Sequence, residues 1–180
     1  MKNVDCSTRI ARTAFACAAA LMLAAAPVAS AQEKQKVSYK VTAEGAKYPQ
    51  RHTLEVGDVP GHTVGLFEIQ RTFKTNAPVV NGVKVKEIWT RGYSDYRDNN
   101  GPSYNYSVYV MENGDKFFTK AMTVGQANAA GRRSTTSVGE ITGGTGKLVN
   151  LRGTFRANGA SEGKVGFNET QAELEYWFAK

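Results

Sequence analysis

Hydrophobic and polar residues alternate along most of the chain after residue 36. Runs that are rich in β-branched or aromatic residues occupy 37–44, 53–56, 63–74, 83–93, 104–112, 117–124, 135–142, 148–157 and 171–178. Turn signals separate these runs, and Asn81-Gly82 and Asn113-Gly114 are typical hairpin turns. No stretch has a convincing helical period. The pattern predicts one all-β domain of roughly eight strands.

An all-β chain of this kind folds as a barrel or a sandwich. A closed antiparallel barrel is favoured because closure leaves no unprotected sheet edge. One face of the run at 63–74 combines apolar residues with Arg71, and the other face carries Glu68. Two interpretations stay open: a barrel with an apolar lower half and a polar mouth, or charged side chains that reach solvent where the strand ends.

A glycine-rich corner with Gly143, Gly144 and Gly146 separates the runs at 135–142 and 148–157. The following Lys147 is reminiscent of a phosphate-binding loop, but Ile141 and Leu148 occupy the positions that need glycine and Ser or Thr. The segment therefore predicts a strand, a tight corner and a strand, without nucleotide binding.

The corner sequence ITGGTGKLVNLRG, at residues 141–153, resembles the corner shared by plant dirigent proteins and allene oxide cyclases. The resemblance extends more weakly from residue 57 to residue 178. It implies an eight-stranded antiparallel β-barrel that binds a small hydrophobic or phenolic molecule in its mouth. It also places Arg152 where dirigent proteins carry a pocket arginine, which implies a guanidinium that holds an anionic or quinonoid group.

The first residues are typical of an export signal. A basic start at 2–12 precedes an apolar run at 14–26 and the small-x-small sequence Ala29-Ser30-Ala31. We predict a Sec-type signal peptide at 1–31 that is cleaved after Ala31, a flexible leader at 32–36 and the β-barrel domain at 37–180. The mature chain then has no cysteine and no transmembrane segment, and its expected location is periplasmic or secreted.

Composition and motifs exclude several function classes. The formal net charge is +7, but basic residues are interleaved with acidic ones, so nucleic-acid binding is not expected. His52 and His62 have no cysteine partners and no HxxxH spacing, so no metal site is predicted. The GxSxG match at 159–163 lies in a loop before a strand and is no nucleophile elbow. No cofactor motif appears.

An aromatic segment at 89–109 is the richest candidate for a site. Aromatic faces supply contact to a flat ligand, and phenol, guanidinium and carboxylate groups fix its orientation. The equally concrete alternative is a scaffold of good strand residues with surface ion pairs. The predicted ligand-binding residues are Trp89, Arg91, Tyr93, Asp95, Tyr96, Tyr104 and Tyr109.

The predicted catalytic residues are Arg152, for charge stabilisation, Tyr106, for proton transfer, and Glu68 and Glu140, the carboxylates available as bases. Three functions stay open. The favoured one is an exported barrel that binds a small hydrophobic or aromatic molecule. The alternatives are a cofactor-independent isomerase, cyclase or lyase, and a structural homo-oligomer, dimer or trimer, of the cell envelope.

Overall fold

A computed structural model describes residues 33–180 of the chain. The predicted signal peptide at 1–31 and the first residue of the predicted leader lie outside the described residues. The described chain contains no helix that is long and apolar enough to cross a membrane.

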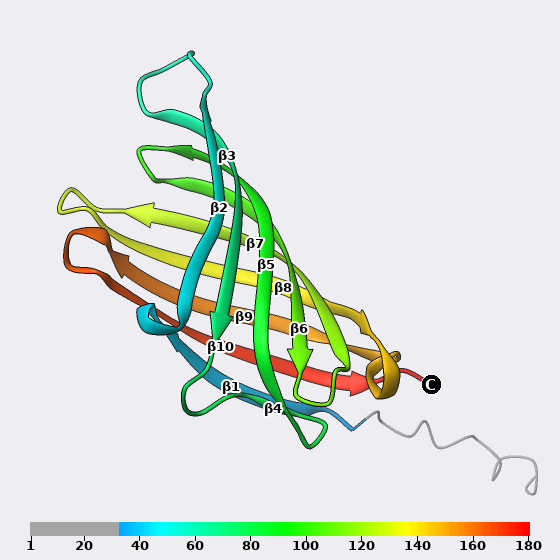
Figure 1. The fold of residues 1–180 in the computed structure, drawn as a ribbon. Helices are drawn as coiled ribbons and strands as arrows, with labels where there is room; N and C mark the ends of the chain where they lie inside the picture. Colours follow the sequence, from blue (N-terminus) through cyan, green and yellow to red (C-terminus); the bar gives the residue numbers. More distant parts are fainter. Residues whose placement is uncertain (1–32) are drawn as a thin grey trace, which may run out of the picture. The chain divides into compact units, whose positions relative to one another are not determined.

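The described residues form strands connected by turns and three short 3-10 segments (Figure 1). The first strands are β1 (Gln35–Thr42), β2 (Ala46–Glu55), β3 (His62–Thr72), β4 (Val79–Val80) and β5 (Val83–Arg97). They are followed by β6 (Gly101–Met111), β7 (Lys116–Ala127), β8 (Arg132–Gly144), β9 (Leu151–Glu162) and β10 (Phe167–Phe178). The 3-10 segments are η2 (Ala43–Gly45), η3 (Gly146–Leu148) and η4 (Gly163–Val165).

All strands belong to one antiparallel sheet with the order β1-β10-β9-β8-β7-β6-β5-β3-β2, and β4 pairs with β5. The all-β prediction is confirmed. The structure has ten strands instead of the roughly eight predicted, because each of the nine runs named above corresponds to one strand and Val79–Val80 adds a short hairpin arm. β1 begins at Gln35, inside the predicted leader.

The sheet is not closed into a barrel by backbone hydrogen bonds. β1 pairs only with β10, and β2 pairs only with β3, so these two strands are the sheet edges in the described chain. β2 is exposed along most of its length, carries Pro49 and has a register shift between Lys47 and Gln50. Proline and irregular register are typical of an edge strand, since neither suits a second pairing partner.

Side chains and a short turn connect the two edges instead. η2 links β1 directly to β2 and contacts both β10 and β3. The ring of Tyr39 on β1 meets Phe73, just after β3, edge to face at 6.0 Å, and the Asn168 amide on β10 donates to the Tyr48 hydroxyl on β2 at 3.1 Å. We call this line of contacts the seam. The sheet coils on itself around its inner face (Figure 1).

The lower part of the inner face is a packed apolar core. Its fully buried side chains include Tyr109, Met111, Phe117, Leu151, Leu174 and Tyr176. Burial alternates along β7 and β10, as expected for strands with one face inward and one outward. The hydrophobic effect of this layer is what holds the coiled sheet together.

The glycine corner separates two strands, as the sequence predicted, and it lies against one end of the core. β8 ends at Gly144 and β9 begins at Leu151, and the buried Leu148 between them packs into the core. The Lys116 N–H donates to the Thr145 hydroxyl at 2.9 Å, and the Thr145 N–H donates to the Lys116 carbonyl at 2.7 Å. The corner is therefore tied to the start of β7.

Candidate functional site

Beyond the apolar core, the inner face encloses a cavity of about 650 Å³. Residues from β1, β2, β3 and β5 through β10 line it, so the coiling of the sheet itself creates the space. The β5–β6, β7–β8 and β9–β10 turns contribute Asn99, Gly131 and Gly166 at one end, which we call the mouth. The volume lies in the range of small-molecule sites, about 300–1,000 Å³.

The cavity wall combines apolar and small polar side chains. The apolar part includes Phe67, Ile69, Ile88, Phe155 and Phe167. The polar part includes Ser94, Ser103, Asn105, Thr123, Thr135, Ser137 and Thr170. Small side chains leave the space open, whereas the larger residues nearer the core fill it. A wall of this composition suits a ligand with an apolar body and a few polar groups.

Two buried tyrosines from distant strands meet at the floor of the cavity. The hydroxyls of Tyr39 on β1 and Tyr109 on β6 lie 2.8 Å apart and share a hydrogen bond. Burial is the main reason that the pKa values of both phenols are raised, and the charge of Arg71 opposes this effect on each. Both phenols are therefore neutral at physiological pH and act as hydrogen-bonding groups rather than bases.

Arg71 on β3 extends into the same region. Its Nη1 donates to the Thr90 hydroxyl at 3.2 Å, and the Thr90 hydroxyl lies 2.8 Å from that of Ser107. Thr90 and Ser107 face each other in the β5–β6 ladder and are both buried. The cross-strand hydroxyl pair thus positions a half-buried guanidinium, and Arg71 has no carboxylate partner in the described part of the chain.

Two further arginines line the cavity towards its mouth. The Arg133 guanidinium lies 4.4 Å from the centre of the Tyr96 ring, and its Nε donates to the Asn99 carbonyl at 3.0 Å. Its Nη2 is buried and has no hydrogen-bond partner among residues 33–180. Arg51, on the edge strand β2, is exposed to solvent. The polar contacts of the mouth thus leave at least one donor unsatisfied.

The predicted ligand-binding residues divide between the two faces of the sheet. Tyr96 and Tyr109 line the cavity. The other five lie on β5 or β6 outside the cavity lining and are Trp89, Arg91, Tyr93, Asp95 and Tyr104. The division follows from alternation, because neighbouring residues of a strand point to opposite faces.

None of the four predicted catalytic residues belongs to the cavity lining. Glu68 pairs with Arg91 at 2.6 Å, and Glu140 pairs with Lys120 at 3.0 Å. Tyr106 is mostly exposed. The Nη1 of Arg152 donates to the Leu151 carbonyl at 2.7 Å, beside the glycine corner. The structure therefore places Glu68 and Glu140 in ion pairs, Tyr106 in solvent and Arg152 at the corner, and it does not bring the four side chains together.

Several exposed apolar residues form a continuous row across five strands. Neighbours in the ladders are Leu66, Tyr93, Tyr104, Met122 and Val138. All five are exposed, and the Tyr93 and Tyr104 rings stack with centroids 5.2 Å apart. We call these residues the outer row.

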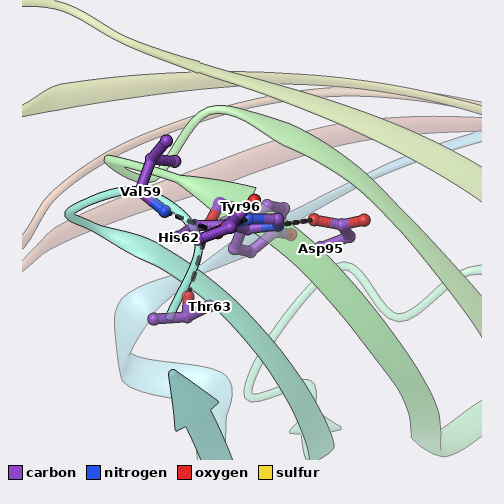
Figure 2. A network of polar contacts seen from close by, with 6 residues as sticks. Val59, His62, Thr63, Asp95 and Tyr96 are labelled. Atoms are coloured by element: carbon purple, nitrogen blue, oxygen red, sulfur yellow. Dashed lines mark hydrogen bonds and ion pairs between the residues drawn. The ribbon is translucent and has the colours of Figure 1, made fainter. Parts of the chain in front are cut away.

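Beside the mouth, His62 forms hydrogen bonds with Asp95 (Figure 2) and with Asp58, two carboxylates that belong to different elements. Its Nδ1 is 2.6 Å from Asp58 in the β2–β3 turn, and its Nε2 is 2.9 Å from Asp95 on β5. Hydrogen bonds to Asp95 and Asp58 raise the pKa of His62, and the bond to His62 lowers the pKa of Asp58. This group, the His62 clamp, holds the turn against β5.

Sequence reasoning did not select Tyr39, Arg71 or Thr90 as site residues. The signal for Arg71 was present, since it shares one face of its strand with Phe67 and Ile69, and all three line the cavity. Tyr39 had no local signal, because its partner Tyr109 lies 70 residues away in the chain.

Comparison of the chain with protein-family models, curated proteins and solved structures finds no match. The resemblance to dirigent proteins and allene oxide cyclases therefore stays a prediction from the corner sequence.

Proposed function

We propose that the protein binds a small, partly apolar or aromatic molecule inside the coiled sheet. The observation that supports this proposal is the cavity of about 650 Å³ between the apolar core and the mouth. A chain that needed only a stable sheet would fill this space with larger side chains, since empty volume forfeits dispersion and hydrophobic contacts. The small Ser, Thr, Gly and Ala residues of the wall keep it open instead.

Binding is favoured over turnover because of where the acid and base candidates lie. Glu68 and Glu140 are paired with cations away from the cavity. The phenols at the floor have raised pKa values, so the phenolate form that could act as a base is scarce at physiological pH. The isomerase, cyclase or lyase alternative would have to use these neutral phenols as proton donors. A barrel-like binding protein needs no such group.

The proposed binding can be tested with N-phenyl-1-naphthylamine, a neutral aromatic probe whose fluorescence rises on transfer to an apolar site. We expect saturable binding and a raised melting temperature, because a ligand of the folded state stabilises it by mass action. The Ala157→Phe variant should weaken binding, since Ala157 is buried on the inner face.

The matched control is Thr154→Phe, which adds the same ring on the same strand at an exposed position outside the cavity lining. It should bind the probe like the wild type. Probe binding that is absent from the wild type, or equally strong in the Ala157→Phe variant, would contradict a ligand site inside the sheet.

A homo-oligomer, dimer or trimer, is a separate part of the proposal and is supported by the outer row. Contiguous exposed apolar residues are typical of contact surfaces. Tyr104→Lys should then lower the mass measured by light scattering without changing the β-rich circular dichroism. A wild-type mass equal to that of one chain would contradict the proposed oligomer.

We also propose a periplasmic or secreted location.

A further inference from the structure

The charges that line the cavity are all of one sign. Arg51, Arg71 and Arg133 contribute to the lining, while no Asp, Glu or Lys does so in the described chain. The carboxylates that form ion pairs in residues 33–180 are absent from the lining, and they pair with cations elsewhere. The interior is therefore a cationic space enclosed by a sheet whose carboxylates lie outside it.

Arg71 is the deepest of the three cations. It lies opposite Ile88 in the β3–β5 ladder, and Ile88 lies opposite Tyr109 in the next ladder, so the guanidinium belongs to the level of the floor. A guanidinium has five N–H donors. The described contact with the Thr90 hydroxyl uses one of them, and Thr90 is itself fixed by Ser107. Arg71 is thus held in place with most of its donors unused.

A half-buried cation without a counter-charge is unfavourable, because no ion pair offsets the free energy lost on its desolvation. A bound oxyanion from outside the chain would offset that loss. A carboxylate suits Arg71 in particular, since the planar guanidinium binds carboxylates through two parallel hydrogen bonds. The charge of Arg71 opposes the rise that burial causes in the pKa values of Tyr39 and Tyr109, so both hydroxyls lie close enough to Arg71 to interact with the same anion.

The mouth favours the same kind of ligand. Arg133 has a buried Nη2 that finds no hydrogen-bond partner within residues 33–180, and Arg51 is exposed on the edge strand. Cations at the opening of a low-dielectric cavity attract anions and raise their local concentration. The path from the mouth to the floor therefore runs between positive charges, with the apolar surfaces of Phe67, Ile69 and Phe155 beside it.

We propose that the ligand is an amphipathic carboxylate, with its carboxylate on the Arg71 guanidinium and its apolar or aromatic body against Phe67, Ile69 and Phe155. This inference rests on the proposed binding function and adds the chemical class of the ligand. It assigns Arg71, which the sequence did not select, the role of recognising the charge.

The test uses two compounds with one planar body, 2-naphthoate and 2-naphthamide, as competitors of N-phenyl-1-naphthylamine. We expect the wild type to bind the carboxylate about 10-fold or more tightly than the amide. Arg71→Gln should abolish this preference, and Arg71→Lys should retain part of it, because lysine keeps the charge but not the planar fork. Arg156→Gln, which removes an exposed charge outside the cavity lining, is the matched control and should keep the full preference.

Equal affinities for the two naphthyl compounds in the wild type would overturn the carboxylate assignment while leaving the proposed binding intact. A preference that survives Arg71→Gln and disappears in Arg133→Gln would move the anion to the mouth and overturn the role of Arg71. If neither competitor nor the neutral probe binds, the proposed function itself fails. The wild-type comparison decides the ligand class even if a variant does not fold.

Discussion

The hydroxyl pair of Tyr39 and Tyr109 shows what one contact does at the residue scale. It joins β1 to β6 across the inner face, and each group depends on the other because both are buried. A buried hydroxyl that loses its partner costs about 1–3 kcal/mol, whereas removal of both hydroxyls leaves no unsatisfied group.

We therefore expect Tyr109→Phe to lower the free energy of unfolding by about 1–3 kcal/mol. The double variant Tyr39→Phe, Tyr109→Phe should be less destabilised than the sum of the two single variants, because the hydroxyls interact. Urea denaturation of all four proteins measures the coupling. Strictly additive effects would show that the two hydroxyls do not interact.

Arg152 has a structural rather than a ligand-facing position. Its guanidinium donates to the Leu151 and Val149 carbonyls beside the glycine corner. We expect Arg152→Ala to reduce the free energy of unfolding by about 1 kcal/mol, the usual worth of such hydrogen bonds, while probe binding persists. Arg156→Ala on the same strand is the control and should change neither quantity. Loss of probe binding in a stable Arg152→Ala protein would instead support the pocket role that the family resemblance implies.

At the scale of elements, the glycine corner requires a residue without a side chain at position 146, and this requirement can be tested separately from the packing of the corner. Gly146 has φ of +54°, and a Cβ there would lie 1.9 Å from Oδ1 of Asp115. The same carboxylate accepts from the Lys147 N–H at 3.3 Å through Oδ2. A side chain at position 146 must therefore displace a group that ties the corner to β7.

Gly146→Ala should destabilise the protein by about 1–2 kcal/mol, because alanine is strained in the left-handed backbone conformation and its Cβ would displace Asp115. Gly163→Ala is the matched control, because φ there is not positive and nothing lies within 4 Å of its Cβ position. It should be neutral or slightly stabilising. Thermal unfolding of both variants distinguishes the two positions, and equal effects would contradict a conformational demand at Gly146.

The His62 clamp makes the attachment of the β2–β3 turn to β5 dependent on pH. The pKa of His62 is raised above its ordinary value of 6.5, so its stabilising effect is complete below that value and is lost as the pH rises through the raised pKa. The pKa of Asp58 is lowered from 3.8, so its effect is present above 3.8 and is lost as the pH falls through the lowered pKa. The clamp is strongest between these limits.

The difference in melting temperature between the wild type and His62→Gln should be largest near about pH 5 and should vanish towards about pH 9. Asp95→Asn should show the same loss, because it removes the other end of the clamp. A difference that grows with rising pH would contradict the assignment. The stabilisation is modest because the groups are exposed to solvent.

At the scale of the whole molecule, sequence pattern was sufficient for the strands and the corner but not for the face that each strand turns inward. Both faces of β5 and β6 carry aromatic residues, so the alternation that predicted the strands could not separate Tyr96 and Tyr109 from Tyr93 and Tyr104. The choice depends on how the sheet coils, which long-range contacts such as Tyr39 to Tyr109 determine.

Closure was the other property that local pattern could not provide. Avoidance of free edges favoured a barrel, yet the two ends of the sheet meet through side chains at the seam, from β10 to β2 and from β1 to Phe73 after β3. Pro49 lacks a backbone N–H, and the register shift near it interrupts the ladder, so β2 pairs with only one strand in the described chain.

The seam has a consequence for the width of the interior. In a closed barrel, strand number and stagger fix the radius, and a wider interior would require hydrogen bonds to break around the wall. Here side chains such as Tyr48 and Asn168, together with the short η2 turn, join the two ends of the sheet, so strand number and stagger do not by themselves set the width of the interior.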